Sequence, residues 1–352
     1  MEDSFKIIGN EEINFRRNWF ITIFVIVIGI LLVLTVFFND FWDQNDKQNT
    51  TRLIDNSNKK ASDIQLLNST TNQIIPWGLK SLGLEKYQRK EKTKSTKIKV
   101  AILDSGILKE HEDLQGKVVK EFNAINPNQP IEDKFGHGTA IAGVIAAENN
   151  DFGIVGVAPN VEIYSVKILN DNGKGSIESL ITGIEWSIEN KVQVINISFG
   201  MSSNNPELHK IIKKAVNSGI IVVAAAGNNY GLNVNFPARY KDVISVTAVN
   251  SNYKIIPSYS AKGKIDYSLP GAAILTTSKD GKYQEYSGTS LAAAYMTGLV
   301  SIILQNEKKF NLDLEEKDLS KQVNRVLKKY SINIGDKKLY GNGFVKLSYF
   351  RE

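Results

Sequence analysis

The stretch VQVINISFGMSSNNPELHKIIKKAVNSGIIVVAAA at 192–226 decides the fold. It holds two short, β-branched apolar runs, at 192–198 and 220–226, on either side of a segment with helical spacing, 206–218. A strand, a helix and a second strand in this order predict a βαβ unit, in which the two strands are parallel. The apolar runs are continuous instead of alternating, which is typical of strands covered on both faces.

The same succession continues in both directions along the chain. Further strands are expected at 99–103, 161–169 and 243–249, and further helices at 137–147, at 176–190 and from Gly288 to Leu304. The sequence therefore predicts an α/β fold with a mainly parallel sheet and helices on both faces. In open sheets of this kind, ligands bind beyond the carboxyl ends of the strands.

Length and composition exclude several classes of protein. A chain of 352 residues that is 42% hydrophobic can bury a full core, which excludes disorder as a whole. The absence of Cys excludes disulfide scaffolds, thiolate metal sites and cysteine nucleophiles. The excess of Lys and Arg over Asp and Glu, 43 against 37, is too small to predict a nucleic-acid partner.

The N-terminal region predicts a membrane anchor. Residues 20–38 are apolar and carry no charge, and roughly 20 such residues span a bilayer as a helix. A cleaved signal peptide is the rival interpretation, but its apolar region is roughly 7–15 residues long, and residues 39–42 offer no small-residue cleavage site. Arg16 and Arg17 at the edge of the helix place residues 1–19 in the cytoplasm and the bulk of the chain outside the cell membrane.

Two polar segments follow the predicted anchor. Residues 39–72 are rich in Asn, Asp, Ser, Thr and Gln without a sustained period, which predicts a stalk. The segment from Lys86 to Lys99 is rich in Lys and either contacts anionic lipid or wall polymer or is a solvated loop before a strand. Residues 73–352 are then the folded domain.

Three short motifs lie at predicted strand ends or helix starts: Asp104-Ser105-Gly106, His137-Gly138-Thr139 and Gly288-Thr289-Ser290. Each motif alone is explained by turn or capping preferences. Together they supply an acid, a base and a nucleophile on an α/β pattern, which are the parts of a serine hydrolase. Asn228, directly after the strand at 220–226, adds an amide that can donate to a developing oxyanion.

At these residues the chain resembles the subtilisin-like serine peptidases, the subtilase family, and the resemblance runs from about Gln73 to Gly343. The resemblance implies a three-layer subtilisin-like fold for residues 73–352. The motifs that carry it are DSG at 104–106, HGT at 137–139, INISFG at 195–200, AAAGN at 224–228 and SGTS at 287–290.

The resemblance implies a serine endopeptidase that forms an acyl-enzyme intermediate on Ser290. His137 is expected to act as general base and then general acid, with Asp104 orienting its imidazole. Asn228 and the backbone N–H of Ser290 are expected to hold the oxyanion. Two physiological roles stay open, removal of leader peptides or propeptides and housekeeping degradation. The alternative from another class is a catalytically impaired surface protein that binds peptides.

The likeness also implies a groove for an extended peptide or protein substrate, bound by strand addition. Asn235 is expected at the base of the primary pocket, where many relatives have Gly, and should favour small or polar side chains before the scissile bond. The expected edge segments are Gly173, Lys174 and Gly175, and Ser198, Phe199 and Gly200; the pocket walls are this second segment together with Ala225, Ala226 and Gly227.

A structural Ca²⁺ is implied by the loop from Glu148 to Ile154, which matches the family's calcium loop in length. The alternative is a metal-free turn rich in Asn, Asp and Gly. A second, weaker cation site would use the carbonyls of Ala238, Tyr240 and Val243. The expected calcium ligands are the side chains of Gln73, Asp113 and Asn150 and the carbonyls of Glu148, Phe152 and Ile154.

The chain departs from the family pattern in several places. Residues 291–295 read Leu-Ala-Ala-Ala-Tyr where relatives usually have Met-Ala-Ser-Pro-His, so Ala294 predicts a straighter helix than a proline would allow. Ala140 replaces a frequent His. These changes put the rate in doubt but leave the reaction type unchanged. We expect His111 and His209 to be surface groups and the domain to be monomeric, and self-cleavage near Gln73 stays open.

Overall fold

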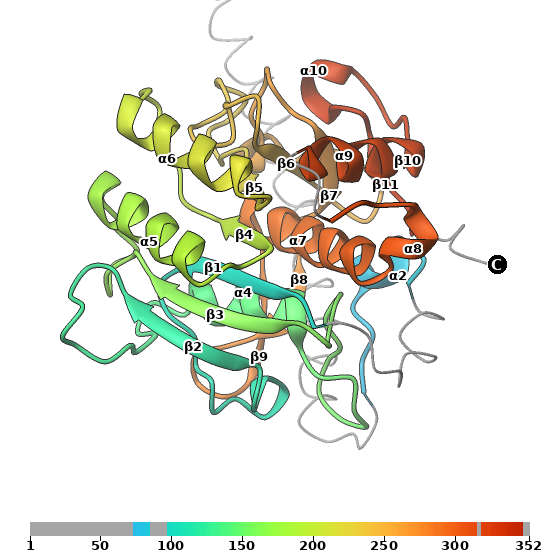
Figure 1. Ribbon diagram of the computed structural model, residues 1–352. Helices are drawn as coiled ribbons and strands as arrows, with labels where there is room; N and C mark the ends of the chain where they lie inside the picture. Colours follow the sequence, from blue (N-terminus) through green and yellow to red (C-terminus); the bar gives the residue numbers. More distant parts are fainter. Residues whose placement is uncertain (1–72, 85–96, 315–317, 348–352) are drawn as a thin grey trace, which may run out of the picture. The chain divides into compact units, whose positions relative to one another are not determined.

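The computed structural model describes residues 73–84, 97–314 and 318–347 (Figure 1), and all of them belong to one compact unit, Leu67–Glu352. The predicted membrane span at 20–38, the predicted stalk at 39–72 and most of the Lys-rich segment lie outside these described residues. Within the described ranges, no helix has both the length and the apolar character needed to cross a bilayer.

A single mainly parallel sheet is the centre of the described domain, with strand order β10-β11-β7-β6-β5-β4-β1-β3-β2. Neighbouring strands run parallel except for β10 and β11 at one edge. The sheet strands are β1 (Lys99–Asp104), β2 (Val118–Asn123), β3 (Glu162–Lys167), β4 (Val194–Ile197), β5 (Ile221–Ala225), β6 (Ile244–Val249), β7 (Tyr267–Pro270), β10 (Ser331–Ile332) and β11 (Phe344–Val345).

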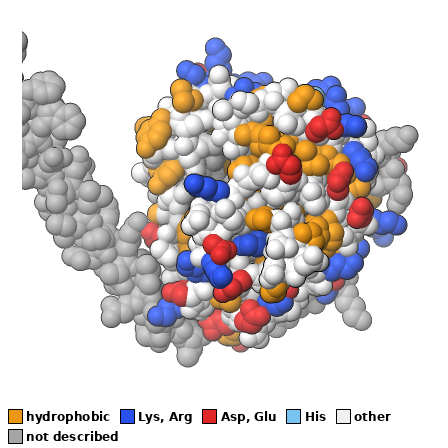
Figure 2. Space-filling view, turned by 90° about the vertical axis from the view of Figure 1, so that its left-hand side faces the viewer, with side chains coloured by type: hydrophobic (Ala, Val, Ile, Leu, Met, Phe, Trp, Pro, Cys, Tyr) orange, Lys and Arg blue, Asp and Glu red, His pale blue; other side chains and the backbone are white. Residues whose placement is uncertain are grey.

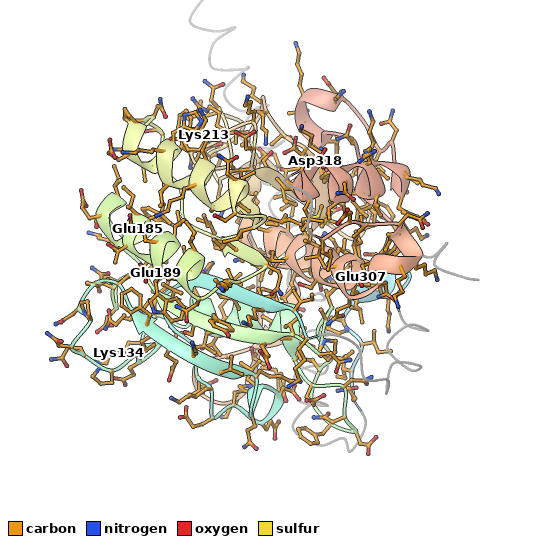
Figure 3. All side chains as sticks on the ribbon, in the orientation of Figure 1. Lys134, Glu185, Glu189, Lys213, Glu307 and Asp318 are labelled. Atoms are coloured by element: carbon orange, nitrogen blue, oxygen red, sulfur yellow. The ribbon has the colours of Figure 1, made fainter. Side chains whose placement is uncertain are left out.

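Helices cover both faces of the sheet, as the sequence predicts (Figure 1). Helices α4 and α7 pack together on one face, and α5 and α6 pack together on the other. Charged side chains such as Glu185 on α5 and Lys213 on α6 point away from the sheet (Figure 3). The longer helices are α4 (His137–Ala146), α5 (Ile177–Glu189), α6 (Pro206–Asn217), α7 (Thr289–Gln305) and α9 (Leu319–Lys329).

Shorter elements complete the described domain. Strands β8 (Ile274–Thr277) and β9 (Tyr283–Tyr286) form a separate antiparallel hairpin that packs against α4. The other short elements are α2 (Trp77–Ser81), η1 (Glu112–Leu114), η2 (Pro257–Tyr259), α8 (Glu307–Phe310) and α10 (Lys337–Tyr340).

Continuous apolar runs behave as expected of strands covered on both faces. In β5, Ile221 and Val223 join the core beneath α4 and α7, whereas Val222 and Ala224 join the core beneath α5 and α6. Helix α7 runs unbroken from Thr289 to Gln305 through the buried Ala294, as expected without a proline at this position.

The strand order brings the predicted motifs to one edge of the sheet. Strands β1 and β5 flank β4 and all three are parallel, so their carboxyl ends lie at the same edge, about 10 Å apart across the pair of strand spacings. Asp104 ends β1, and Asn228 follows β5 by three residues.

On the face seen from the side of α5 and α6, acidic and basic side chains are intermixed (Figure 2), so neither sign of charge dominates this face.

Candidate active site

The predicted acid and base are in contact. Asp104 is the last residue of β1 and is buried, and His137 is the first residue of α4. Nδ1 of His137 lies 2.8 Å and 2.9 Å from the two carboxylate oxygens of Asp104. The backbone N–H of Ser105 also donates to this carboxylate, at 2.8 Å. A proton on Nδ1 therefore faces the carboxylate, and Nε2 is left as the basic atom.

The surroundings of His137 change its proton affinity in opposite directions. Burial by itself lowers the pKa of His137. The charge of Asp104, the hydrogen bond to Asp104 and the charge of Asp133 raise it, and the net effect is a pKa above the ordinary value. The protonated imidazole is therefore stabilised in place, which is what a general base needs after it has taken a proton.

Ser290 lies in the first turn of α7, where the dipole of the helix favours negative charge. Gly288 before this turn has a φ of 147°, a conformation that glycine adopts without strain. Within the described part of the chain, the Ser290 hydroxyl has no hydrogen-bond partner. The acid and base are thus already paired, whereas the nucleophile is unbonded, as is common before substrate binds.

The Asn228 side chain is oriented by the helix that carries Ser290. Its Oδ1 accepts hydrogen bonds from the backbone N–H and the hydroxyl of Thr289, at 2.9 Å and 3.0 Å. The hydroxyl of Thr289 in turn accepts the N–H of Gly227 at 3.2 Å. Because Oδ1 is fixed by two donors, Nδ2 is directed elsewhere, and it has no partner among the described residues. An amide donor is therefore available beside Ser290.

Asn235 lies between the two predicted walls of the primary pocket. A Cβ atom built on Gly200 would lie 2.9 Å from Cβ of Asn235, and one built on Gly227 would lie 2.9 Å from its Nδ2. The N–H of Asn235 donates to the carbonyl of Ala226 at 3.0 Å. The structure thus brings the segments at 198–200 and 225–227 together around this side chain.

The other predicted edge segment, at 173–175, is closed into a turn. The N–H of Lys174 donates to the side chain of Asn170 at 3.0 Å, and Gly175 forms a bridge with Leu169. Phe135 lies against this turn, because a Cβ atom on Gly173 would be 2.4 Å from the tip of its ring. That ring is 44% exposed and its centroid lies 6.2 Å from that of His137, so Phe135 lies beside the base.

All six predicted calcium ligands gather in one place. Nε2 of Gln73 lies 2.7 Å from the carbonyl of Glu148, 3.0 Å from Oδ1 of Asn150, 3.2 Å from the carbonyl of Phe152 and 3.1 Å from that of Ile154. Four oxygens thus surround one amide nitrogen, which has only two hydrogens to donate.

Asp113 completes this cluster of oxygens. Its carboxylate accepts the N–H of Ile154 at 2.9 Å. Burial raises the pKa of Asp113 above its ordinary value despite that hydrogen bond. Carbonyl, amide and carboxylate oxygens form the donor set that a hard cation such as Ca²⁺ takes, so these residues fit the ion. The described residues contain no group of three or more His, Asp or Glu side chains that could hold a metal ion, and this loop offers mainly neutral oxygens.

The predicted second cation site contains a cation of the chain's own. The ammonium group of Lys264 donates to the carbonyl of Val243, one of the three expected ligands, and also pairs with Asp266 at 2.6 Å. Ser245 donates its N–H to the same carboxylate at 2.8 Å. The carbonyl of Val243 therefore already accepts a hydrogen bond from an ammonium group of the chain.

The prediction that His111 is a surface group is wrong. Its side chain is buried: Nδ1 accepts the N–H of Asp113 at 3.2 Å, Nε2 lies 2.9 Å from the carbonyl of Lys282, and the ring packs edge-on against Tyr283. His209 is half-buried, with its ring stacked 4.3 Å from that of Tyr240. Both histidines lie outside the acid and base pair.

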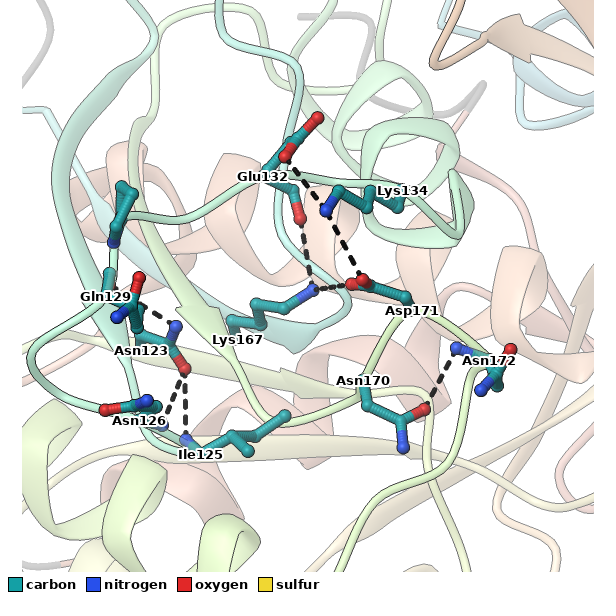
Figure 4. Close-up of a pocket in the computed structure, with 11 residues that line it drawn as sticks. Asn123, Ile125, Asn126, Gln129, Glu132, Lys134, Lys167, Asn170, Asp171 and Asn172 are labelled. Carbon is teal, nitrogen blue, oxygen red and sulfur yellow. Dashed lines mark hydrogen bonds and ion pairs between the residues drawn. The ribbon is translucent and has the colours of Figure 1, made fainter.

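Sequence reasoning missed two buried charges beside the acid. Asp133 accepts hydrogen bonds from both the turn after Asp104 and the start of α4. Lys167 is one of the residues that line a polar pocket of about 450 Å³ (Figure 4). An Asp four residues before the base was a signal in the sequence, but its partners become neighbours only in the fold.

Comparisons with known proteins show the family of the described domain. The sequence model of the subtilase family, Peptidase_S8, matches residues 95–343. Subtilisin DY of Bacillus licheniformis is 34% identical over 279 residues, which cover 78% of this chain and 98% of that protein. Subtilisin E of Bacillus subtilis is 36% identical over 279 residues, 78% of this chain and 71% of that protein. The thermostable alkaline protease of Halalkalibacterium halodurans is 35% identical over 277 residues, 78% of this chain and 73% of that protein.

An α/β domain with a buried acid and histidine pair at the carboxyl edge of its sheet defines the class, a serine hydrolase. The chain belongs to the subtilase family. It is a subtilisin-like serine endopeptidase, a hydrolase that acts on peptide bonds.

Proposed function

We propose that this chain is a membrane-tethered serine endopeptidase in which Asp104, His137 and Ser290 are the catalytic residues and Asn228 is the oxyanion donor. The contact between Asp104 and His137, at 2.8 Å and 2.9 Å, is the observation that carries the assignment. The Asn228 amide, held by Thr289 beside the nucleophile, supports it independently.

The first half of the proposed reaction forms an acyl-enzyme. Oγ of Ser290 attacks the carbonyl carbon of the scissile bond while Nε2 of His137 takes its proton. The negative charge that develops on the carbonyl oxygen is held by Nδ2 of Asn228 and the backbone N–H of Ser290. His137 then gives the proton to the leaving amine, and the carbon–nitrogen bond breaks. Asp104 stabilises the imidazolium between these two steps.

The second half releases the acyl group. A water molecule gives a proton to His137 as it attacks the ester on Ser290, and the proton then returns to the Ser290 oxygen as that bond breaks. The same donors hold the second oxyanion. Asp104 keeps its charge throughout, so one acid and base pair serves both halves of the reaction.

The substrate side of the proposal is an extended peptide between the segments at 173–175 and 198–200. Backbone hydrogen bonds to these edges supply general affinity, and pockets select side chains. The position of Asn235 between Gly200 and Gly227 supports a preference for small or polar residues before the scissile bond.

We further propose that Gln73, Asp113 and Asn150, with the carbonyls of Glu148, Phe152 and Ile154, hold a structural Ca²⁺. The convergence of four oxygens on the Gln73 amide supports this assignment. When bound, the ion supplies positive charge that stabilises these oxygens and the Asp113 carboxylate. Ile74, next to Gln73, also forms a β-bridge with Ile154, so the chain itself closes the loop.

The proposed location follows from the sequence alone. The apolar run at 20–38, with Arg16 and Arg17 before it, supports an anchor that leaves the catalytic domain outside the cell. A tethered enzyme acts beside exporters, so we propose a processing role on leader peptides or propeptides. Cell fractionation, with external protease added to intact cells, tests this location: the catalytic domain should sediment with membranes and be accessible from outside.

Labelling of the purified full chain with a fluorophosphonate probe tests the catalytic assignment. We expect wild-type chain to be labelled and Ser290→Ala to be unlabelled. His137→Ala should lower the labelling rate by several orders of magnitude, because the hydroxyl is then without its base. If folded wild-type chain is not labelled, the catalytic assignment is wrong and a peptide-binding surface protein becomes the better interpretation.

A further inference from the structure

A buried carboxylate, Asp133, lies in the loop before α4 and is only 8% exposed. Its Oδ1 accepts the hydroxyl of Ser105 at 2.7 Å and the N–H of Gly136 at 2.7 Å. Its Oδ2 accepts the N–H of Thr139 at 2.9 Å and the hydroxyl of Thr139 at 2.6 Å. Four hydrogen bonds satisfy the carboxylate, and all four come from residues next to the acid and base.

The hydroxyls of Ser105 and Thr139, which both donate to Asp133, link the turn after β1 to the first turn of α4. Ser105 of the turn accepts an N–H from α4, and Thr139 of α4 accepts an N–H from the segment after the turn. Ser105, next to Asp104, donates to Asp133 and accepts the N–H of Gly138 at 3.0 Å. Thr139, in the first turn of α4, donates to Asp133 and accepts the N–H of Leu108 at 2.9 Å. The turn after β1 and the first turn of α4 are therefore joined twice, with the carboxylate of Asp133 common to both links.

A buried ammonium group holds the other side of the same turn. Nζ of Lys167 donates to the carbonyl of Ser105 at 2.7 Å. It also donates to the carbonyl of Glu132, next to Asp133, at 3.1 Å (Figure 4). Lys167 also pairs with Asp104 in the register of β1 and β3. Ser105 is thus held through its hydroxyl by the carboxylate of Asp133 and through its carbonyl by the ammonium group of Lys167.

The two linked segments also touch directly. A Cβ atom on Gly138 would lie 2.0 Å from the carbonyl oxygen of Gly106 and 3.2 Å from Cβ of Asp104. At this separation the backbones are in van der Waals contact, so a shift of one segment must move the other.

We propose that Asp133 is a positioning residue, which fixes the geometry between Asp104 and His137 by joining the turn after β1 to the start of α4 through Ser105 and Thr139. Asp133 has no hydrogen bond to either catalytic side chain, so it acts through their chain neighbours. The inference rests on the proposed catalytic residues, because it assigns Asp133 a role in their arrangement.

The Asp133→Asn variant tests this role. Whichever way the amide is turned, its NH₂ group faces a backbone N–H, that of Gly136 or that of Thr139. A hydroxyl can turn to accept a hydrogen bond but a backbone N–H cannot, so the loop and the start of α4 must shift apart. A misplacement of about 1 Å at a catalytic group costs about 10²-fold in rate. We therefore expect kcat to fall by about that factor while KM changes by less than about threefold, because Asp133 itself makes no hydrogen bond to the peptide edges at 173–175 and 198–200.

A pH profile separates positioning from a general loss of stability. The charged groups around His137 are Asp104 from β1 and Asp133 from the loop, with Lys167 of β3 behind Ser105. Lys279, after β8, lies against Gly136 and donates to the carbonyl of Lys134, and the first turn of α7 carries no acid. Because the charge of Asp133 raises the pKa of His137, the acidic limb of kcat/KM should move to lower pH in Asp133→Asn. A merely structural residue would leave the limb in place.

The control is Thr276→Val, which removes another buried hydrogen bond to α4, from the Thr276 hydroxyl to the carbonyl of Ala140 at 2.8 Å. Thr276 is in β8 and has no link to Ser105. We expect this variant to lose thermal stability. Its kcat should stay within about twofold of wild type, and the midpoint of its acidic limb should equal that of wild type within error. All variants are made in the full chain and assayed with an internally quenched peptide that wild type cleaves.

A second pair of variants covers the case in which Asp133→Asn does not fold. Ser105→Ala breaks one link and should lower kcat, whereas Thr139→Ser keeps the other hydroxyl and should retain more activity than Thr139→Val. The proposal is overturned if Asp133→Asn keeps wild-type kcat and acidic limb, or if Ser105→Ala and Thr139→Val behave like Thr276→Val. If Ser290→Ala is as active as wild type, the catalytic assignment itself is wrong.

Discussion

Replacing Asn235 by glycine should enlarge the primary pocket and change which peptide bonds are cleaved. The Asn235 side chain fills the space between Gly200 and Gly227, where a Cβ atom on either glycine would come within 2.9 Å of it. Without that side chain, the space between the two walls opens to a large residue of the substrate. We therefore expect Asn235→Gly to accept aromatic residues before the scissile bond.

The size of the change follows from the surface that becomes buried. Fully burying a Phe side chain is worth about 1.5–3 kcal/mol. Each 1.4 kcal/mol is a factor of ten, so kcat/KM for a peptide with Phe before the scissile bond should rise by about 10- to 100-fold. The value for the matching Ala peptide should change by less than about threefold, because its methyl group already fits.

The assay compares kcat/KM for two quenched peptides that differ only in this residue, Phe or Ala. The control is Asn233→Gly, two residues upstream, because Asn233 is exposed and the same substitution there carries the same backbone entropy cost of about 0.5–1 kcal/mol. The reasoning is refuted if wild type already prefers Phe to Ala, or if Asn235→Gly and Asn233→Gly give the same ratio.

Three other predictions follow from the site. Asn228→Ala should lower kcat by about 10²–10³ with little change in KM, the range known for the oxyanion-hole Asn of a subtilisin, and steady-state kinetics would contradict it if KM changed instead. Because the pKa of His137 is raised, the acidic limb of kcat/KM should have its midpoint above the ordinary histidine value of 6.5; a pH profile with a lower midpoint counts against this. Removing Ca²⁺ by chelation should lower Tm by about 5–10 °C, as expected for an ion present at about 100 times its Kd, and Asp113→Asn should abolish that dependence in calorimetry.

The sequence predicts those parts of the fold that depend on the pattern of apolar residues within one segment. The run at 220–226 is apolar throughout and the run at 192–198 is mostly apolar. They become β5 and β4, with ends moved by one or two residues. Asp104, His137 and Asn228 are predictable from the sequence because each lies at the end of a strand, shortly after one, or at the start of a helix, where the fold places functional groups.

The parts that the sequence missed depend on contacts between distant segments. Asp133 lies in a loop without periodicity, and its function requires Ser105, 28 residues away, to point at it. His111 is buried because Lys282 and Tyr283 of the β8 and β9 hairpin cover it, and nothing in the residues around position 111 indicates that hairpin. The burial of a single polar residue in a loop therefore cannot be predicted from the residues next to it in the sequence.

Among residues 291–295, which differ from the usual family sequence after Ser290, Tyr295 packs against α2, the first helix of the described domain. Tyr295 of α7 is buried, and a Cβ atom on Gly78 of α2 would lie only 2.2 Å from its hydroxyl oxygen. Trp77 beside it donates its indole N–H to the carbonyl of Ala273 at 3.0 Å. Together with Gln73 at the oxygen cluster, these contacts make the segment from residue 73 an integral part of the catalytic domain. A cut that separates the proposed stalk from the enzyme should therefore fall before Gln73, because one after it would remove contacts of both the proposed calcium loop and the helix that carries Ser290.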